Sequence, residues 1–484
     1  MIFHNLSGYD GHIIFQSIPK IEKCKDPHVI ARSMENYTAF SIGRLQFMDS
    51  LQHLSSSLAN LVNNLADKTK IKGCKYCSKR GTEKYISRHE KIDHISDQIE
   101  HPHTEKNQTL TELFANTYAN FKKKYNHLPD EAFEMLTRKG VYPYNYVDGI
   151  EKFQHKLKDL SKSDFTNDLT KQQISEEDYA FVQKLWDTFQ LKNLGELHDL
   201  YMETDTLLLS DVFQNYRKII LKNYELDPVH FLTAPSLSWA AGLKYTKAQL
   251  EIPTDIDTHL FFDLGLRGGI SMVVNQFARA NNNLMGEKYK SNTQQSFIQY
   301  VDANNLYGWA MSQFLPFGGF QWVSRLNSNS STITDDDDCN KSMQEWEQEI
   351  MKLSEEDPVG YMFQVDLEYP EKLHFDLKHD NFPLAPESIK IEKDMLSNYQ
   401  QKLADEIDVK CGFEKLCLTL RDKDNYVCHY RNLKFYLKHG LKLKKIHRIL
   451  QFNQSAWLRP YIELNTKLRQ KSNNKFEENF LKLM

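Results

Sequence analysis

Apolar and polar residues follow two different periods along this chain of 484 residues. Where apolar residues recur at every second position, the pattern predicts strands. The predicted strands after the N-terminal one are 45–50, 270–275, 297–301 and 443–452. Where apolar residues recur three or four positions apart, the pattern predicts helices. The main predicted helices are 111–137, 176–222 and 228–264, with another starting at Pro460. We therefore expect a mixed α/β protein.

Polar stretches interrupt this pattern at 67–108 and at 325–345, and both read as loops or insertions. The length allows two to four domains with cores of their own. No uncharged apolar run approaches the roughly 18 residues that a membrane-spanning helix needs. The first residues lack the features of a signal peptide. Seven cysteines are dispersed, which fits reduced thiols better than disulfides. We expect a soluble, intracellular protein with no membrane partner.

Charge is unevenly distributed along the chain. The net charge is −4, yet residues 431–484 contain thirteen Lys and Arg against three Glu. A basic segment on an otherwise acidic protein suits binding to a polyanion such as DNA. A solvated helical face explains the same residues equally well. Charge alone leaves both interpretations open.

The most informative motif is the hexapeptide from Asp302 to Tyr307, which directly follows the predicted strand 297–301. An aspartate where a strand ends can present a free carboxylate to magnesium, and the backbone N–H groups of the following turn suit phosphate oxygens. Such a set fits nucleotidyl transfer. A simple Asp-Asn turn between a strand and a helix is the alternative.

Three further motifs accompany it in a fixed order. They are Asn5 to Asp10, Tyr201 to Asp205, and Arg267-Gly268-Gly269. Tyr201 and Asp205 are four residues apart in a predicted helix and therefore share one face. A phenol beside a metal-holding carboxylate could orient a water there. Taken singly, each motif also has a purely structural interpretation.

With these motifs in this order, nearly the whole chain resembles the protein-primed branch of family B DNA polymerases, as found in Polinton/Maverick-type transposons and related viruses. The resemblance implies an RNase H-like 3′–5′ exonuclease domain over 1–220. A connecting helical region would follow over 221–296. A partial palm, an insertion that contacts terminal protein and the start of the fingers would occupy 297–484. The implied partners are DNA, dNTPs and a terminal protein primer, and a transposon polymerase would work in the nucleus.

The resemblance implies an exonuclease site in the first domain. Asp10 and Asp205 would hold magnesium, and Tyr201 would assist them. Lys139 would support catalysis, from a motif that spans Lys139 to Tyr142. A Ser-Leu motif that contacts single-stranded DNA maps onto Ser50 and Leu51, or less well onto Ser57-Leu58.

The resemblance also implies a polymerase site. Asp302 would hold both magnesium ions. The double-glycine link to DNA maps onto Arg267, Gly268 and Gly269, with Leu266 in place of the family's Tyr. The residues implied to bind nucleotide are Ala303, Asn304, Asn305, Leu306, Tyr307 and Lys482.

Parts of both sites are expected to be missing. No Asp-x-Glu precedes Asp10, and we expect no later Asp-x-Asp to supply the polymerase's further carboxylates. Asp255 and Asp257 instead mark a helix start. Because two-metal catalysis needs several carboxylates, we expect a polymerase fragment, truncated at both ends and inactive by itself. The alternatives are a non-catalytic DNA-binding remnant and, less consistent with the missing Asp-x-Glu, a stand-alone nuclease.

The polar insertion contains one candidate zinc site. Its four ligands have nearly the spacing of a two-Cys/two-His finger, one residue short in the middle, and are Cys74, Cys77, His89 and His94. Few apolar residues between them could build a finger core. A polar loop that happens to contain both pairs is therefore the other interpretation.

Overall fold

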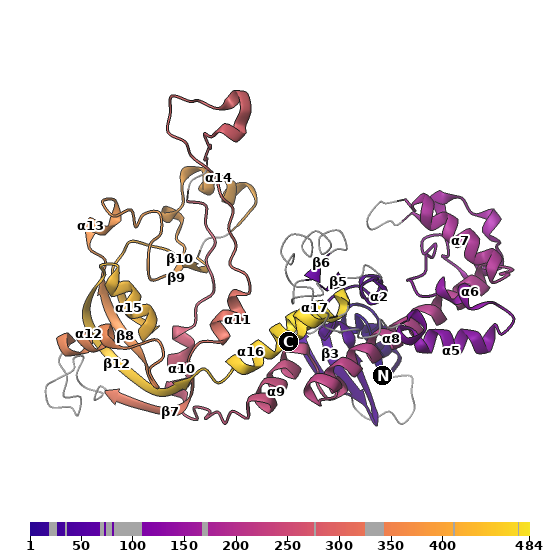
Figure 1. The fold of residues 1–484 in the computed structure, drawn as a ribbon, viewed down its shortest axis with the longest axis horizontal. Helices are drawn as coiled ribbons and strands as arrows, with labels where there is room; N and C mark the ends of the chain where they lie inside the picture. The colour runs from indigo at the N-terminus through magenta and orange to yellow at the C-terminus, as the bar shows by residue number, and fades with distance from the viewer. Residues whose placement is uncertain are drawn as a thin grey trace, which may run out of the picture. The chain divides into compact units, whose positions relative to one another are not determined.

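The structure of the protein is a computed structural model, shown in Figure 1. It describes residues 1–484 except 19–26, 34–35, 68–71, 74–79, 82–108, 167–172, 275–276, 325–342, 410–411 and 473. The chain is a mixed α/β protein with 48% helix and 17% strand, as its hydrophobic pattern predicts. It divides into two compact units. The first unit is Met1–Lys247 together with Tyr461–Met484, and the second is Ala248–Pro460.

The first unit combines a small sheet with helices. Its sheet has four strands, which are β1 (Ile2–Phe3), β2 (His28–Ser33), β3 (Asn36–Ile42) and β4 (Leu45–Asp49). Two further short strands, β5 (Lys72–Gly73) and β6 (Arg80–Gly81), form an antiparallel pair. The α-helices are α1 (Asp10–Ser17), α2 (Leu58–Ala66), α4 (Leu110–Leu113), α5 (Ala115–Lys124), α6 (Asp130–Glu134), α7 (Glu176–Thr188), α8 (Leu194–Tyr224), α9 (Ala234–Thr246) and α17 (Lys475–Leu483). Helix α16 (Arg459–Lys471) begins at the end of the second unit and continues into the first.

The strand order in this sheet is β1-β4-β3-β2. Strand β1 runs parallel to β4, whereas β3 is antiparallel to β4 and to β2. Phe3 is paired with Asp49, so both neighbouring strands end at the same edge. A cluster of Leu6, Phe40 and Phe47 closes over one face. The parallel pair therefore brings the turn after β1 beside the turn after β4.

Helix α8 is the longest element of the first unit, with 31 residues. Asn193 caps its first turn by accepting a hydrogen bond from the backbone N–H of Glu196. Leucines and other apolar residues recur on one stripe and are buried, as expected for a helix that packs along its length. The carboxylate of buried Asp211 accepts hydrogen bonds from the backbone N–H groups of Asn116 and Thr117, at 2.8 and 2.9 Å. Helix α8 thereby caps the N-terminus of α5 from outside.

The second unit contains a larger sheet. Its strands are all antiparallel in the order β11-β8-β12-β7, and are β7 (Leu315–Ser324), β8 (Val359–Glu368), β11 (Lys423–His429) and β12 (Lys442–Ser455). A separate two-stranded antiparallel sheet consists of β9 (Glu387–Lys390) and β10 (Glu414–Cys417). The helices are α10 (Ile256–Gly265), α11 (Leu306–Met311), α12 (Met343–Lys352), α13 (Glu371–His374), α14 (Asn398–Glu406) and α15 (Tyr430–Lys438).

Both faces of this sheet are covered. Trp346 and Ile350 of α12 and Leu433 of α15 belong to a cluster with buried residues of β8 and β12. Phe261 of α10 belongs to a second cluster, with Met362 and other buried side chains of the sheet. Because alternate residues of a strand face opposite sides, Met362 and its neighbours in β8 serve different clusters. The sheet is the core of the second unit.

The C-terminal elements agree with the hydrophobic pattern. Helix α15 ends just before Gly440, strand β12 includes the predicted 443–452, and α16 begins beside Pro460. Gly440 has a φ of +97°, which favours glycine and ends the helix. Among the described residues, no helix has the length and apolarity to cross a membrane.

Two predicted strands are wrong. Residues 297–301 pair with no strand, and their side chains are exposed, with Tyr300 at 93% and Val301 at 76%. The described residues of 270–275 are likewise outside any strand. An alternating segment forms a strand only where a neighbouring segment pairs with its backbone hydrogen-bonding groups. No described segment pairs with these residues as a strand.

The unit boundaries also differ from the predicted domains. Residues 221–247 belong to the first compact unit, not to a separate connecting region. Residues 461–484 belong to the first unit as well, although the predicted start of the fingers was grouped with the palm. Tyr224 shows why, since its hydroxyl donates to Asn465 Oδ1 at 2.5 Å and is buried there. The functions assigned to these domains stay predictions.

Replacing Asp211 by alanine tests the cap between α8 and α5. Asp211→Ala leaves two buried N–H donors without an acceptor, so we expect it to lower the free energy of unfolding by about 3 kcal/mol. Asp199→Ala, an exposed site on the same helix, should change it by less than about 0.5 kcal/mol. Hydrogen exchange of the α5 and α8 amides measures both variants. Equal exchange in the two would contradict the capping role.

Candidate active site

The turn after β1 is held by a buried carboxylate at the end of β4. Asp49 is 2% exposed, and its Oδ1 accepts hydrogen bonds from the backbone N–H groups of Asn5 at 2.8 Å and Leu51 at 3.0 Å. Its Oδ2 accepts from the N–H of Ser7 at 3.4 Å. A buried carboxylate is tolerated when several N–H groups share its charge. Asp49 therefore fixes the shape of the segment that leads to Asp10.

A second cluster lies on one face of α8, where the structure brings together three of the predicted catalytic residues. The Nζ of Lys139 donates to Tyr201 Oη at 2.6 Å and to Asp205 Oδ2 at 2.5 Å. Tyr201 is 7% exposed, and the Asp205 side chain is 19% exposed. The spacing of four residues places both on the same face of the helix, as predicted. Lys139 comes from the segment after α6 and bridges them.

Tyr144 joins this cluster, and the sequence interpretation gave it no role. Its hydroxyl is hydrogen-bonded to that of Tyr201, while its side chain is 63% exposed. The ring of Tyr142 stacks on Tyr201 with 5.2 Å between centroids. The only signal in the sequence was the density of tyrosines between 140 and 148. Burial, aided by the hydrogen bond to Tyr144 and the charge of Asp205, raises the pKa of Tyr201 well above its ordinary value.

One oxygen of Asp205 is left without a hydrogen-bond partner. Its Oδ1 is buried and accepts no hydrogen bond, whereas its Oδ2 pairs with Lys139. A buried carboxylate oxygen with no donor is unfavourable unless a cation compensates it. The donor chemistry of Asp205 therefore fits a hard metal ion such as magnesium.

Asp10 is the other predicted metal ligand of the first unit. It is the first residue of α1 and is half-buried. Among the described residues, none makes a hydrogen bond or ion pair with its carboxylate. The described part of the chain also contains no group of three or more His, Cys, Asp or Glu side chains arranged to hold a metal. The joint role of Asp10 and Asp205 stays a prediction.

The predicted DNA contact at Ser50 is deeply buried. Ser50 is 1% exposed, and its hydroxyl oxygen lies 2.7 Å from the carbonyl oxygen of Phe3 and 3.0 Å from Nδ1 of His4. Leu51, its neighbour, is half-buried. Any contact with DNA in this segment therefore falls to Leu51 and the backbone, while the Ser50 side chain is engaged within the protein.

The predicted polymerase motif is exposed. Asp302, Ala303, Asn304, Leu306 and Tyr307 all lie at the surface, and Tyr307 is 87% exposed. The Asp302 carboxylate is therefore accessible to solvent, as a metal ligand must be before the ion binds.

Asn305 gives this motif its turn. It caps α11 with a φ of +54°, a left-handed conformation that asparagine adopts more readily than most residues. A Cβ on Gly308 would lie only 2.3 Å from the Asn305 side chain, so a larger residue there would displace that side chain. Asn5 has a φ of +72°, and a Cβ on Gly8 would lie 2.7 Å from its side chain. The same Asn-x-x-Gly turn thus leads to the helix after Asp302 and to the one that begins with Asp10.

The double-glycine segment begins at an arginine held by the second unit. One Nη atom of Arg267 donates to the carbonyl oxygen of Val427 at 2.6 Å, and its guanidinium lies 4.0 Å from the Tyr426 ring centroid. Gly268 and Gly269 are exposed, with open space where a side chain would be. Close approach of a ligand's backbone is therefore sterically free at both glycines, whereas Arg267 is already engaged.

Lys482, the last predicted nucleotide-binding residue, is exposed on α17 in the first unit. Asp302 belongs to the second unit. Their joint role at one nucleotide stays a prediction. The zinc candidates Cys74, Cys77, His89 and His94 lie outside the described residues.

A literal Asp-x-Asp follows Asp302 in the sequence, at Asp422 and Asp424, contrary to our expectation that none exists. Asp422 Oδ1 accepts a hydrogen bond from the backbone N–H of Tyr369 at 2.7 Å, and its Oδ2 lies 3.5 Å from Lys444. The intervening Lys423 is 1% exposed and pairs with Glu387. Asp422 thus serves contacts within the second unit.

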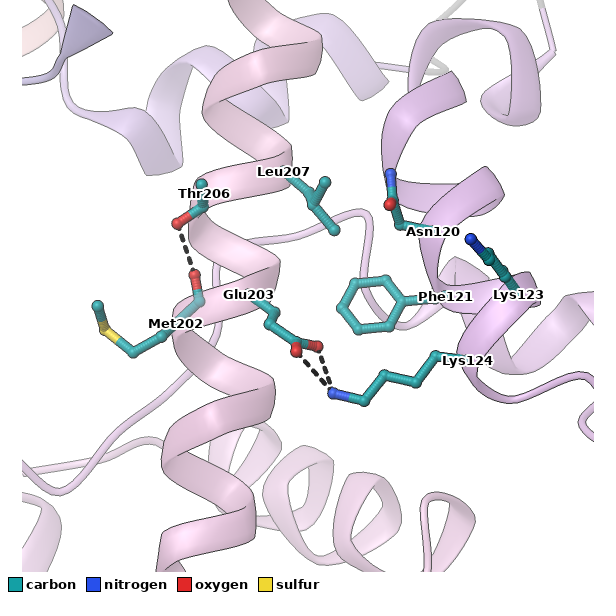
Figure 2. A pocket seen from close by; sticks show the side chains of 8 residues that line it. All are labelled: Asn120, Phe121, Lys123, Lys124, Met202, Glu203, Thr206 and Leu207. Carbon is teal, nitrogen blue, oxygen red and sulfur yellow. Dashed lines mark hydrogen bonds and ion pairs between the residues drawn. The ribbon is translucent and has the colours of Figure 1, made fainter. Parts of the chain in front are cut away.

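A groove on the opposite side of α8 is separate from the candidate site. It has a volume of about 650 Å³ and is lined by α5 and α8, as Figure 2 shows. The Nζ of Lys124 on α5 donates to both carboxylate oxygens of Glu203 on α8, at 2.6 and 2.7 Å. Because Glu203 is two positions before Asp205, it lies on nearly the opposite face of the helix.

Comparison with solved structures finds Phi29 DNA polymerase. Its orthorhombic crystal form is 13% identical over 100% of this chain, with a TM-score of 0.41. Its complex with primer-template DNA and incoming nucleotides is 12% identical, with a TM-score of 0.39. Its complex with single-stranded DNA is 14% identical, also with a TM-score of 0.39. This chain spans 57% of the first two chains and 56% of the third. No protein-family model and no curated protein matches the sequence.

Alkaline unfolding tests the environment of Tyr201. Above about pH 10 an unfolded tyrosine releases its proton, whereas folded Tyr201 keeps its own because its pKa is raised. The free energy of unfolding should therefore fall as pH rises, with Tyr201 contributing up to about 1.4 kcal/mol per pH unit. Tyr201→Phe removes this contribution, so its stability should decline less steeply between about pH 10 and 11. Denaturant titrations at several pH values measure the difference, and parallel declines would contradict it.

Proposed function

We propose that this chain is part of a DNA-directed DNA polymerase of the protein-primed family B, with an associated 3′–5′ exonuclease domain. The observation that carries the proposal is the cluster of Lys139, Tyr201 and Asp205, with one buried carboxylate oxygen left for a cation. The first unit would remove nucleotides from a DNA 3′ end. The second unit would contribute Asp302 to nucleotide addition, with primer-template DNA and dNTPs as substrates.

Each residue of the first cluster has a distinct task in this proposal. Lys139 neutralises part of the Asp205 charge and fixes its orientation through Oδ2. Tyr201 stays protonated because burial and its neighbours raise its pKa, so its hydroxyl can orient a water or a phosphate oxygen. Tyr144 holds that hydroxyl from the solvent side. In this proposal the cluster provides a hydrogen-bond acceptor and a donor side by side.

Magnesium is the cofactor that these groups suit. In the first unit, Asp205 and Asp10 would hold it, and in the second unit Asp302 would. When bound, the ions would stabilise charge on the attacking and leaving oxygens of a phosphoryl transfer. Lys139 limits Asp205 to a single free oxygen, so Asp205 alone cannot surround an ion and the Asp10 carboxylate is needed as well.

The polymerase role depends on the turn that begins at Asp302. Asn305 and Gly308 shape a turn in which Asp302 and the following backbone are open to solvent. By the resemblance, Ala303 to Leu306 would contact the triphosphate and Tyr307 would pack against the sugar. Gly268 and Gly269 leave room for a DNA backbone. A terminal protein primer and a transposon or viral origin belong to the same proposal.

A non-catalytic DNA-binding remnant is the second candidate. It is favoured by the state of Asp302, whose carboxylate has no hydrogen bond or ion pair with any described residue. A catalytic carboxylate usually has partners that orient it. Exposed glycines and basic residues would still suffice to bind phosphates.

Manganese binding tests the site at Asp205. Mn²⁺ can replace magnesium at carboxylate sites and is detected by electron paramagnetic resonance. We expect the wild-type chain to bind Mn²⁺ and Asp205→Asn to bind it at least about tenfold more weakly, because the amide carries no charge. Glu203→Gln on the opposite face of α8 is the matched control and should bind like the wild type. Equal binding by wild type and Asp205→Asn would remove Asp205 from the metal site.

Primer extension tests the role of Asp302. Any extension of a primer–template by this chain in magnesium should fall about 100-fold or more in Asp302→Asn, because a ligand of the reacting ions is lost. Asp424→Asn, in the sequence Asp422-Lys423-Asp424 of the second unit, should leave the rate unchanged. Binding of primer–template DNA without any extension by the wild type would favour the DNA-binding remnant. Equal extension by wild type and Asp302→Asn would refute the role of Asp302.

A further inference from the structure

His4 connects the segment after β1 to both ends of the loop after β4. Its Nδ1 lies 3.0 Å from Ser50 Oγ, and its Nε2 lies 2.8 Å from the carbonyl oxygen of Ser56. The Ser50 hydroxyl in turn lies 2.7 Å from the carbonyl oxygen of Phe3. One imidazole therefore spans the loop that contains the predicted DNA contact Leu51. No role of His4 follows from the predicted active-site motifs.

The protons in this chain of contacts can be counted. A carbonyl oxygen only accepts, so Nε2 must donate its proton to Ser56. The Ser50 hydroxyl has a single proton and two neighbouring acceptors, the Phe3 carbonyl and His4 Nδ1. If His4 is neutral, its proton is on Nε2, and Nδ1 takes the proton of Ser50. If His4 is protonated on both nitrogens, Nδ1 donates to Ser50, whose proton must then point to Phe3.

The surroundings favour the neutral ring. Burial lowers the pKa of His4, and the nearby positive charge of Lys139 lowers it further. The hydrogen bond to Ser56 and the charge of Asp49 act in the opposite direction without reversing the shift. Lys139, from the segment after α6, and Asp49, at the end of β4, are the charged groups that face His4. At neutral pH, Ser50 thus donates to His4.

We propose that His4 is a positioning residue, which closes the loop from Ser50 to Ser56 through its contacts with both ends of it. The proposal rests on the function proposed above in one respect, that this loop contacts the single-stranded 3′ end. In this proposal the Ser50 side chain contacts only protein groups, His4 and Phe3. Leu51 and the loop backbone would contact the nucleic acid.

Hydrogen exchange of the loop tests the positioning role in the full chain. The amides that report on closure are those of His53 and Leu54, which donate to the Ser50 carbonyl, and that of Ser56. His4→Phe removes both polar contacts and should speed their exchange about tenfold at neutral pH, since each contact is worth roughly one hydrogen bond.

Two further variants separate the two ends of the ring. His4→Gln retains a donor in the place of Nε2 but loses the partner of Ser50, so exchange should be faster than in the wild type and slower than in His4→Phe. His4→Asn retains a partner near Ser50 but does not reach Ser56, so exchange should still be faster than in the wild type. If none of the variants changes loop exchange, the positioning role is overturned.

Affinity for DNA separates this proposal from the proposed function. Fluorescence anisotropy with a labelled oligothymidylate, without divalent metal, measures binding of a single strand. We expect His4→Phe to weaken it about tenfold, because an open loop must be ordered before it binds. If loop exchange responds as expected but DNA affinity does not change, His4 positions the loop, and the assignment of Leu51 to DNA binding fails instead.

Discussion

The buried carboxylate of Asp205 is the constraint on which the candidate site depends. A charge removed from water needs compensation, and here Lys139 supplies it for one oxygen only. The other oxygen accepts no hydrogen bond from any described residue. As a purely structural ion pair, Lys139 and Asp205 therefore leave one carboxylate oxygen without a partner. A metal-dependent function would use that oxygen as a ligand.

Asp49 has the opposite character. It is more deeply buried than Asp205, yet three backbone N–H groups satisfy it, and no oxygen is left over. Its effect is to join the turns after β1 and β4 at one edge of the sheet. His4 adds a second connection between the same turns. The first unit thus separates carboxylates that build the scaffold from one that remains available for chemistry.

The second unit places its candidate residues differently. Its core is the sheet with α10, α12 and α15 against it, whereas Asp302 and its neighbours are exposed in a segment without strand partners. Arg267 holds the start of the double-glycine segment through Val427 and the Tyr426 ring. Only the Asn305–Gly308 turn is fixed locally, by backbone conformation and close packing. The chemistry proposed for Asp302 therefore needs partners beyond those that the described residues provide.

The sequence by itself determined the mixed α/β class, most helices, and the common face of Tyr201 and Asp205, because these depend on local periodicity. It also predicted a turn after Asp302, whereas the left-handed conformations of Asn5 and Asn305 were found only in the structure. It could not determine whether 297–301 forms a strand, because a strand needs hydrogen-bonding partners distant in the chain. Nor could it find Tyr144, His4 or the structural use of Ser50 and Asp422. Those roles follow from which side chains and carbonyls the tertiary structure brings within hydrogen-bonding distance.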